Sequence, residues 1–249
     1  MKNTGILRIQ AFGARQSSPT EGVLVTVSGN GFTAQRITDE TGTAADLSIE
    51  APSCALSLQE NNTIRPYAVV DLTATKAGFR TVRIQGVQIF AGQVTLAQPE
   101  MIPETEEDRD VVNPPIVIPE HSLFTGDGGS GPDPMENCMP RVLSRVIIPK
   151  NITVHLGKPA ASARNVTVSF RDYIANVASS EVYPTWPEQA LRANIHCQIS
   201  LALNRIYTEW YPSKGYPFNI TNSTSYDQYY VHGRTVFDVM ARITDDIFN

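Results

Sequence analysis

Apolar and polar residues alternate through most of the first hundred positions, which predicts β-strands. In the stretch GILRIQAFG, residues 5–13, Leu7 and Ile9 alternate with Arg8 and Gln10. The same period of two recurs in GVLVTVSG, FTAQRITD, AADLSIEAP, AVVDLTATKAGF and TVRIQGVQIFAGQVTLAQ. Turn-forming residues separate the runs, and no helical pattern of useful length interrupts them. We therefore expect residues 1–98 to form an antiparallel β-sandwich of about seven strands.

Proline, glycine and acidic residues dominate the next segment, residues 99–145, in PETEEDRD, NPPIVIPE and GDGGSGPDP. Such a composition buries too little apolar surface to offset the entropy lost on ordering, so this segment is predicted to be a linker. Exposed linkers are preferred sites of proteolysis, and an activating protease is therefore a hypothetical partner. Limited proteolysis that cut only at the chain ends would contradict this hypothesis.

The period changes in residues 146–249, which predicts a mixed α/β domain. RVIIPKNITVHLG, residues 145–157, predicts a strand. A helix is expected to begin after Ser169 as its N-cap and to end near Glu181. Its apolar face has the spacing i, i+3, i+4, i+7 and consists of Phe170, Tyr173, Ile174 and Val177. Beyond residue 215, a loop with a strand and a final amphipathic helix, RTVFDVMARITDDIFN, are predicted.

A long central helix is predicted between Glu188 and Tyr211, where a second apolar stripe runs up to Pro212. Pro187 suits the first turn of this helix, and Thr185 is expected to cap it. Cys197 falls in the apolar stripe and is expected in the core. The overall fold class is therefore α+β with more than one domain.

Composition and charge narrow the function classes. The chain of 249 residues is 41% hydrophobic and carries a formal net charge of -5, so it has enough apolar residues for a core but no basic surplus for nucleic acid. No apolar run approaches the roughly 20 residues that a membrane helix needs, and the start is not a typical signal peptide. The three cysteines are far apart, which favours neither a disulfide framework nor a zinc ribbon. We expect neither a metal nor a cofactor.

The stretch VSFRDYIANVASSEVYPTWPEQALRANIHCQISLALNRIY resembles the core motif of the stage II sporulation protein D family. The matching positions are Tyr173, Ile174, Val177, Glu181, Trp186, Pro187, Ala190, Leu191, Arg192 and Ala193. A later segment, FNITNSTSYDQYYVHG, is similar to the family's second motif through Phe218, Thr221, Ser223, Gln228, Tyr230 and Gly233. Together with the β-rich front half, these motifs resemble clostridial spore-cortex-lytic enzymes. The TDETG turn and the AGF segment further resemble the transthyretin-like, carboxypeptidase regulatory-like sandwich, which is an accessory module.

The resemblance implies lytic cleavage of peptidoglycan glycan strands, the expected partner, with formation of 1,6-anhydromuramic ends in a spore or cell wall. An internal hydroxyl nucleophile removes the need for the second carboxylate of ordinary glycosidases. Glu181 matches the family's catalytic glutamate. A single acid/base must stay partly protonated near neutral pH, so its pKa is expected to be raised, with Val182, Tyr183 and Trp186 removing water from it.

The other candidate site residues carry two interpretations each. Arg192 binds a substrate carboxylate or N-acetyl oxygen, or is surface charge. Tyr183 and Trp186 stack on sugar rings, or belong to the core. The resemblance further places Ser223, Gln228 and Tyr230 along the substrate cleft.

Two departures from the family pattern keep a second hypothesis open. Ile199-Ser200 stand where many members have Arg-Thr, and the segment 221–230 lacks the Cys and His through which some members hold zinc. The chain also ends at Asn249, before the family's second half, so we expect a front portion of the catalytic domain. The alternative is a catalytically silent peptidoglycan-binding or structural protein of the spore or cell wall.

Overall fold

The computed structural model describes residues 3–13, 18–29, 31–59, 62–105, 113–121, 142–145 and 147–249. By compactness the chain divides into two units that do not follow its order. Unit 1 comprises Met1–Glu120, Tyr183–Trp186 and Gly233–Val239; unit 2 comprises His121–Val182, Pro187–His232 and Met240–Asn249. The expected bounds 1–98, 99–145 and 146–249 stay predictions. Most of the expected linker lies outside the described residues, and the hypothetical protease cleavage within it stays a prediction.

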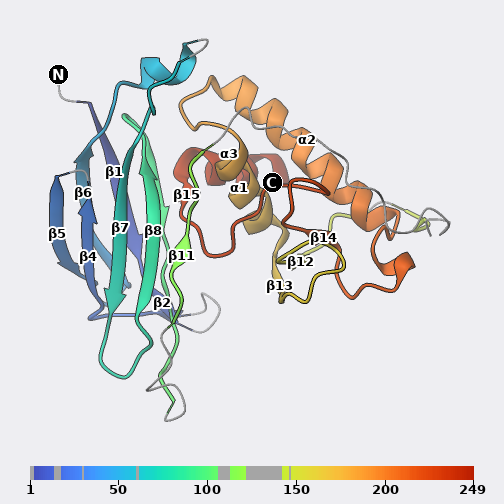
Figure 1. Cartoon of the computed structure of the whole chain (residues 1–249), viewed down its shortest axis with the longest axis horizontal. Helices are drawn as coiled ribbons and strands as arrows, with labels where there is room; N and C mark the ends of the chain where they lie inside the picture. The colour runs from blue at the N-terminus through green and yellow to red at the C-terminus, as the bar shows by residue number, and fades with distance from the viewer. Residues whose placement is uncertain are drawn as a thin grey trace. The chain divides into compact units, whose positions relative to one another are not determined.

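Unit 1 is a β-sandwich with two main sheets (Figure 1). Its strands are β1 Thr4–Gln10, β2 Phe12–Gly13, β3 Ser18–Pro19, β4 Leu24–Gly29, β5 Phe32–Ile37, β6 Thr43–Glu50, β7 Ala68–Thr75, β8 Val82–Ile89, β9 Val94–Ala97, β10 Glu100–Met101, β11 Ile116–Val117 and β15 Val236–Phe237. One sheet has the order β15-β9-β1-β6 and the other β11-β8-β7-β4-β5. A 3₁₀ helix spans Cys54–Leu58.

Period-two patterning places the sandwich core as expected. In β7 the buried residues Ala68, Val70, Leu72 and Ala74 alternate with more exposed ones. Side chains from both main sheets form one hydrophobic cluster, in which Leu7 and Ile9 of β1 are fully buried. Burial of this kind contributes about 1.5–3 kcal/mol for each large aliphatic side chain.

Most strand pairs of the two main sheets are antiparallel, as expected, and a minority are parallel. β1 pairs antiparallel with β6 but parallel with β9, with Ile6 opposite Val94 and Ile9 opposite Ala97. Alternation along a strand sets which face is buried, but it carries no information about the direction of the neighbouring strand.

Unit 2 contains a small sheet and the helices of the chain's second half. Its elements are β12 Asn151–His155, β13 Asn165–Ser169, β14 Ile220–Thr221, α1 Phe170–Glu181, α2 Glu188–Tyr207, most of α3 Asp238–Phe248, and a 3₁₀ helix Pro212–Lys214. The sheet order is β13-β12-β14, with β12 antiparallel to β13 and parallel to β14. The helix α1 follows β13 directly and packs against α2. The predicted α+β fold with a long central helix is confirmed.

Several predicted boundaries move. Among the described residues of the expected strand 145–157, β12 is the part that forms, and Pro149, which offers no backbone N–H, lies just before it. The helix α2 ends at Tyr207, and Glu209 then adopts a positive φ of 46°, a left-handed conformation typical of helix ends. Pro187 occupies the N-cap position rather than the first turn, without a side-chain cap. The expected cap Thr185 instead donates its hydroxyl to Ser57 Oγ at 2.7 Å.

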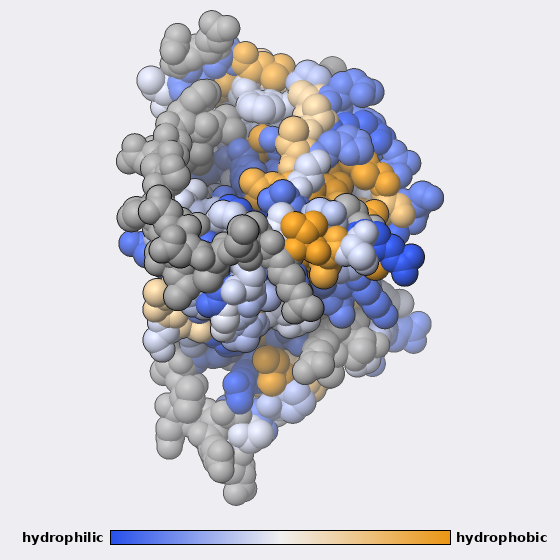
Figure 2. Space-filling view, turned by 90° about the vertical axis from the view of Figure 1, so that its right-hand side faces the viewer, coloured by the Kyte–Doolittle hydropathy of each residue, from blue (hydrophilic) through white to orange (hydrophobic). Residues whose placement is uncertain are grey.

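Large apolar side chains are exposed in unit 2, in a surface that mixes hydrophobic and hydrophilic residues (Figure 2). They include Val142, Leu143, Ile147, Ile148 and Leu201. In the part of the chain that the structure describes, none of the helices has the length and apolarity needed to cross a membrane.

Candidate active site

The helix α1 places Glu181 at a defined point, because its start and its buried face are both encoded locally. Ser169 Oγ accepts the Asp172 N–H at 3.0 Å, which caps the first turn as expected. Tyr173, Ile174 and Val177 are fully buried along the helix. The next residue after the helix, Val182, is extended, so Glu181 is the last helical residue.

The Glu181 carboxyl is mostly buried and receives two hydrogen bonds within unit 2. Tyr229 N–H donates to Oε1 at 3.0 Å, and Gln198 Nε2 on α2 donates to Oε2 at 2.7 Å. These donors come from residues 48 and 17 positions away in the sequence. Sequence reasoning did not single out either of them.

Burial raises the pKa of the Glu181 carboxyl above its ordinary value, and the hydrogen bonds from Tyr229 and Gln198 oppose that rise. The C-terminal end of a helix carries a partial negative charge, which also disfavours a carboxylate at this position. The predicted direction of the pKa shift therefore agrees with the structure. A carboxyl with a raised pKa is a better proton donor at a given pH than an ordinary carboxylate, as a general acid requires.

A polar network behind Glu181 fixes the segment that supplies Tyr229. Tyr173 OH donates to Gln228 Oε1 at 3.0 Å, and Gln228 Nε2 donates to the Gln198 carbonyl at 3.1 Å. Asn176 binds Val231 twice, accepting its N–H at 3.1 Å and donating to its carbonyl at 2.8 Å. The Tyr229 N–H therefore lies between two residues, Gln228 and Val231, whose positions are fixed by hydrogen bonds.

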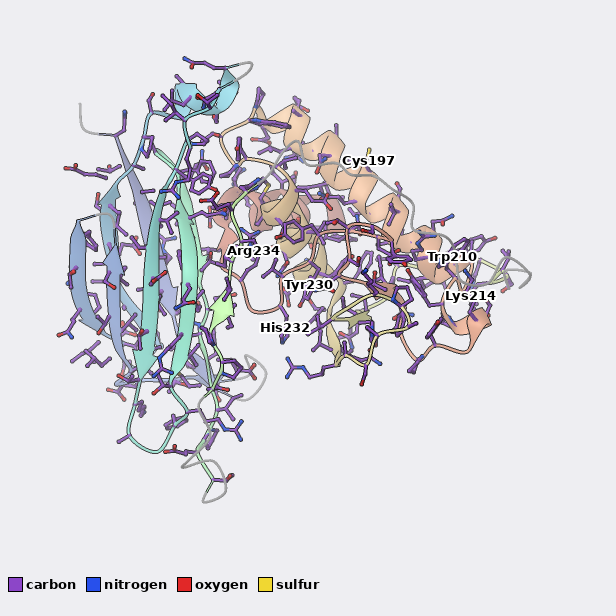
Figure 3. The ribbon with its side chains drawn as sticks, viewed as in Figure 1. Cys197, Trp210, Lys214, Tyr230, His232 and Arg234 are labelled. Atoms are coloured by element: carbon purple, nitrogen blue, oxygen red, sulfur yellow. The ribbon has the colours of Figure 1, made fainter. Side chains whose placement is uncertain are left out.

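Gln228 and Tyr230, both predicted for the cleft, are buried in this network. The Tyr230 ring stacks on Tyr173 with centroids 5.4 Å apart, and its hydroxyl lies 3.0 Å from His232 Nδ1 (Figure 3). In these positions Gln228 and Tyr230 help to hold the segment that contains Tyr229, which donates to Glu181. The third predicted cleft residue, Ser223, is partly exposed, and its carbonyl accepts the N–H of Tyr226 and of Asp227 in a turn.

Asp227 is a buried charge that the sequence did not indicate. Its side chain has 0% exposure and its Oδ1 lies 2.7 Å from Arg205 Nε. Its Oδ2 accepts Tyr211 OH at 2.6 Å and both the N–H and the hydroxyl of Thr221, at 3.0 and 2.7 Å. This carboxylate ties β14 and the end of α2 to the turn before Gln228.

Arg192 is engaged by carboxylates of its own unit. Its Nη2 lies 2.9 Å from Glu188 Oε1 one turn earlier on α2, and its Nη1 lies 2.6 Å from Asp246 Oδ2 on α3. Of its two interpretations, this arrangement fits an ion pair on the surface of unit 2.

Tyr183 and Trp186 belong to unit 1. The Tyr183 ring contacts Phe90 and Tyr67 edge-on or tilted, with centroids 5.5 and 6.5 Å apart. Trp186 Nε1 donates to the Ser57 carbonyl at 3.3 Å. Both side chains therefore make contacts within unit 1 and are half-buried there, whereas Glu181 and its two donors lie in unit 2.

The expectation that Cys197 is buried was wrong, because its side chain is exposed on α2 (Figure 3). The buried face of α2 is formed by Leu191, Ile195, Gln198, Ile199 and Ala202, and position 197 lies beside this stripe rather than within it. Near the end of α2, the cations of Arg205 and Lys214 lie over the Trp210 ring, 4.5 and 4.0 Å from its centroid. Among the described residues no group of three or more His, Cys, Asp and Glu has the arrangement of a metal site.

Comparisons with known proteins give only distant likenesses. No protein-family model matches the sequence, and no curated protein matches it. Solved structures that align include the Bacillus anthracis TIE protein (16% identity, 41% of this chain and 17% of that one, TM-score 0.29). A second is Klebsiella pneumoniae 5-hydroxyisourate hydrolase (18% identity, 40% of this chain and 92% of that one, TM-score 0.26). A third is 3-chlorocatechol 1,2-dioxygenase from Rhodococcus opacus (12% identity, 42% of this chain and 61% of that one, TM-score 0.29). At these TM-scores the likeness decides neither fold nor function.

Proposed function

We propose that unit 2 cleaves peptidoglycan glycan strands by lytic transglycosylation, with Glu181 as the single acid and base. The observation that carries the proposal is the mostly buried Glu181 carboxyl, whose pKa is raised by burial and whose two oxygens are held by Tyr229 N–H and Gln198 Nε2. Its position in the sporulation protein D-like motif supplies the substrate class, a glycan of N-acetylmuramic acid and N-acetylglucosamine.

In the reaction Glu181 first donates a proton and then takes one back. The protonated Glu181 donates its proton to the glycosidic oxygen as the bond from that oxygen to the muramic anomeric carbon breaks. The resulting carboxylate removes the proton from the 6-hydroxyl of the same sugar, and that oxygen bonds to the anomeric carbon. The products are a free hydroxyl on one strand and a 1,6-anhydromuramic end on the other. Glu181 regains its proton, and no water is consumed.

Two features of the site suit this use of one carboxyl. The raised pKa keeps Glu181 protonated to a higher pH than an ordinary carboxyl, which favours the first step. The fixed donors at Oε1 and Oε2 keep the carboxyl in one place while it passes from acid to base, and fixed orientation lowers the barrier of the second step.

Digestion of purified peptidoglycan tests the proposal. The full chain is incubated with spore cortex and, separately, with vegetative peptidoglycan, and the soluble fragments are analysed by mass spectrometry for 1,6-anhydromuropeptides. Wild type is expected to release them, and Glu181→Gln to reduce release at least about a hundredfold, the low end for loss of a general acid/base. Glu40→Gln, an exposed carboxyl in the turn after β5, is the matched control and should behave as wild type.

Two results would overturn the proposal. One is the absence of anhydro ends from the wild-type digest, and the other is undiminished release by Glu181→Gln. Sedimentation with insoluble peptidoglycan in the absence of cleavage would instead support the silent glycan-binding alternative.

A further inference from the structure

Gln198 has an unusual hydrogen-bond balance for a buried amide. Its residue is 3% exposed, and its Nε2 donates to Glu181 Oε2 at 2.7 Å. Its other polar end, Oε1, is buried and has no hydrogen-bond partner among the described residues. Buried amide oxygens are normally satisfied, so this one is open to an additional donor.

The neighbouring Gln228 shows the opposite case. Its Oε1 accepts the Tyr173 hydroxyl and its Nε2 donates to the Gln198 carbonyl, so both ends have partners. Exchanging the two ends of Gln228 would lose both bonds, which fixes the orientation of that amide. Exchanging the two ends of Gln198 loses only the bond to Glu181 and moves an acceptor to the place that faces Oε2.

The donor on the other side of Glu181 decides which oxygen takes the proton. Tyr229 N–H is a backbone group that only donates, and it points at Oε1 at 3.0 Å. The carbonyl oxygen of a carboxylic acid accepts such a bond better than its hydroxyl oxygen does, so Oε1 remains the acceptor when Glu181 is protonated. The proton then lies on Oε2, beside the Gln198 amide.

We propose that Gln198 is a positioning residue whose side-chain amide flips, so that its nitrogen and oxygen exchange places, as Glu181 Oε2 gains or loses its proton. In the carboxylate state Nε2–H donates to Oε2, as the structure shows. In the acid state the O–H on Oε2 donates to Gln198 Oε1, which now occupies the place of the nitrogen, because the two ends of an amide differ little in size. The carboxyl therefore keeps one position in both states. The use of this pair in catalysis rests on the proposed function, whereas the coupling itself does not.

Other ionisable groups around the pair do not provide this coupling. Tyr173 on α1 and Tyr230 in the segment 222–232 have pKa values raised by burial, so both phenols stay neutral at physiological pH. His232 contacts Tyr230, and Asp227 pairs with Arg205. Among the described residues the hydrogen bonds to the Glu181 carboxylate come from Tyr229 and Gln198.

Nuclear magnetic resonance of the isotope-labelled full chain tests the flip of the Gln198 amide directly. The Glu181 carboxyl carbon and the Gln198 side-chain amide are followed through a pH titration, with Glu181→Gln and Gln198→Met used to assign the two signals. Both signals are expected to change at the same midpoint. Above the midpoint the Nε2 hydrogens should show contacts to the Glu181 γ hydrogens, and below it these contacts should be lost. The Gln228 amide serves as the internal control and should keep its contacts.

Contacts between Gln198 Nε2 hydrogens and Glu181 that persist on both sides of the midpoint would overturn the inference. A Gln198 midpoint that survives in Glu181→Gln would do so as well. Failure of the proposed function is distinguishable: coupled titration without anhydro products leaves the pair intact and removes its catalytic use. If anhydro products form but the Gln198 amide does not flip, only the proposed role of Gln198 is refuted.

Discussion

The Glu181 side chain is held in place by donors although its environment disfavours its charge. Burial raises the pKa of the carboxyl, and the hydrogen bonds from Tyr229 N–H and Gln198 Nε2 offset only part of that rise. A solvated surface glutamate would need neither donor, and a purely structural buried carboxylate would be expected beside a cation, as Asp227 is beside Arg205. Glu181 therefore combines a fixed position with a proton that it can release.

Glu181→Gln is expected to stabilise the folded protein increasingly as pH rises. Below the ordinary carboxyl pKa, about 4.3, the folded and unfolded chains both hold the proton. Above it the unfolded chain releases the proton while the folded chain keeps it up to the raised pKa. Wild type thus loses unfolding free energy across this window, by about 1.4 kcal/mol for each unit that separates the two pKa values. Glutamine does not titrate and avoids the loss.

Thermal unfolding of both variants between acidic and mildly basic pH measures this effect. The difference in Tm between Glu181→Gln and wild type should grow with pH and then level off above the folded pKa. Glu40→Gln, in the exposed turn after β5, is the control. A difference that stays constant, or shrinks with pH, would contradict a raised pKa at Glu181.

Asp227→Asn is expected to destabilise unit 2 by about 3 kcal/mol, because removal of one partner leaves a buried charge without compensation. The substitution takes the carboxylate from Arg205 Nε and replaces an acceptor of Tyr211 or Thr221 with a donor. Urea denaturation followed by circular dichroism measures the loss. Asp246→Asn, which breaks an exposed pair with Arg192, should change stability by less than about 1 kcal/mol and is the matched control. Equal losses in the two variants would refute the role of Asp227.

At the scale of elements, the site is built where a locally encoded helix meets a segment held by distant contacts. The N-cap Ser169 and the apolar spacing of α1 were readable from the sequence, so the place of Glu181 at the helix end could be predicted. Gln198 and Tyr229 could not, because their hydrogen bonds to Glu181 span 17 and 48 residues and have no spacing that repeats. The parallel pairing of β1 with β9 escaped for the same reason. Local patterns give faces and ends, and tertiary contacts decide the rest.

Ser169→Ala is expected to lower the free energy of unfolding by about 1 kcal/mol, since the Asp172 N–H would lose its side-chain acceptor at the start of α1. Ser200→Ala on α2 is the matched control. The Ser200 hydroxyl bonds back to the His196 carbonyl four residues earlier and is exposed, so its loss should be neutral or slightly stabilising. Chemical denaturation of the two variants under identical conditions provides the comparison. A neutral Ser169→Ala would show that the cap does not determine the start of α1.

At the scale of the whole molecule, unit 1 is assembled from segments far apart in the chain. The strand β15, from residues 236 and 237, pairs antiparallel with β9, and Phe237 is fully buried with its ring edge-on to Phe90 at 5.3 Å. Tyr183 adds a second late residue to the same aromatic group. The early part of the sequence therefore does not complete unit 1 without the late part.

This assembly predicts the behaviour of a protein cut in the expected linker. A specific protease site introduced between residues 125 and 135 would separate the chain into two pieces, each of which contributes to unit 1. After cleavage the pieces should elute together in gel filtration under native conditions and separate in urea. Phe237→Ala, which removes about 3–5 kcal/mol of buried aromatic packing, should weaken their association. Pieces that separate without denaturant would mean that residues 183–186 and 233–239 are not integral to unit 1, and a regulatory cut in the linker would then release the two parts.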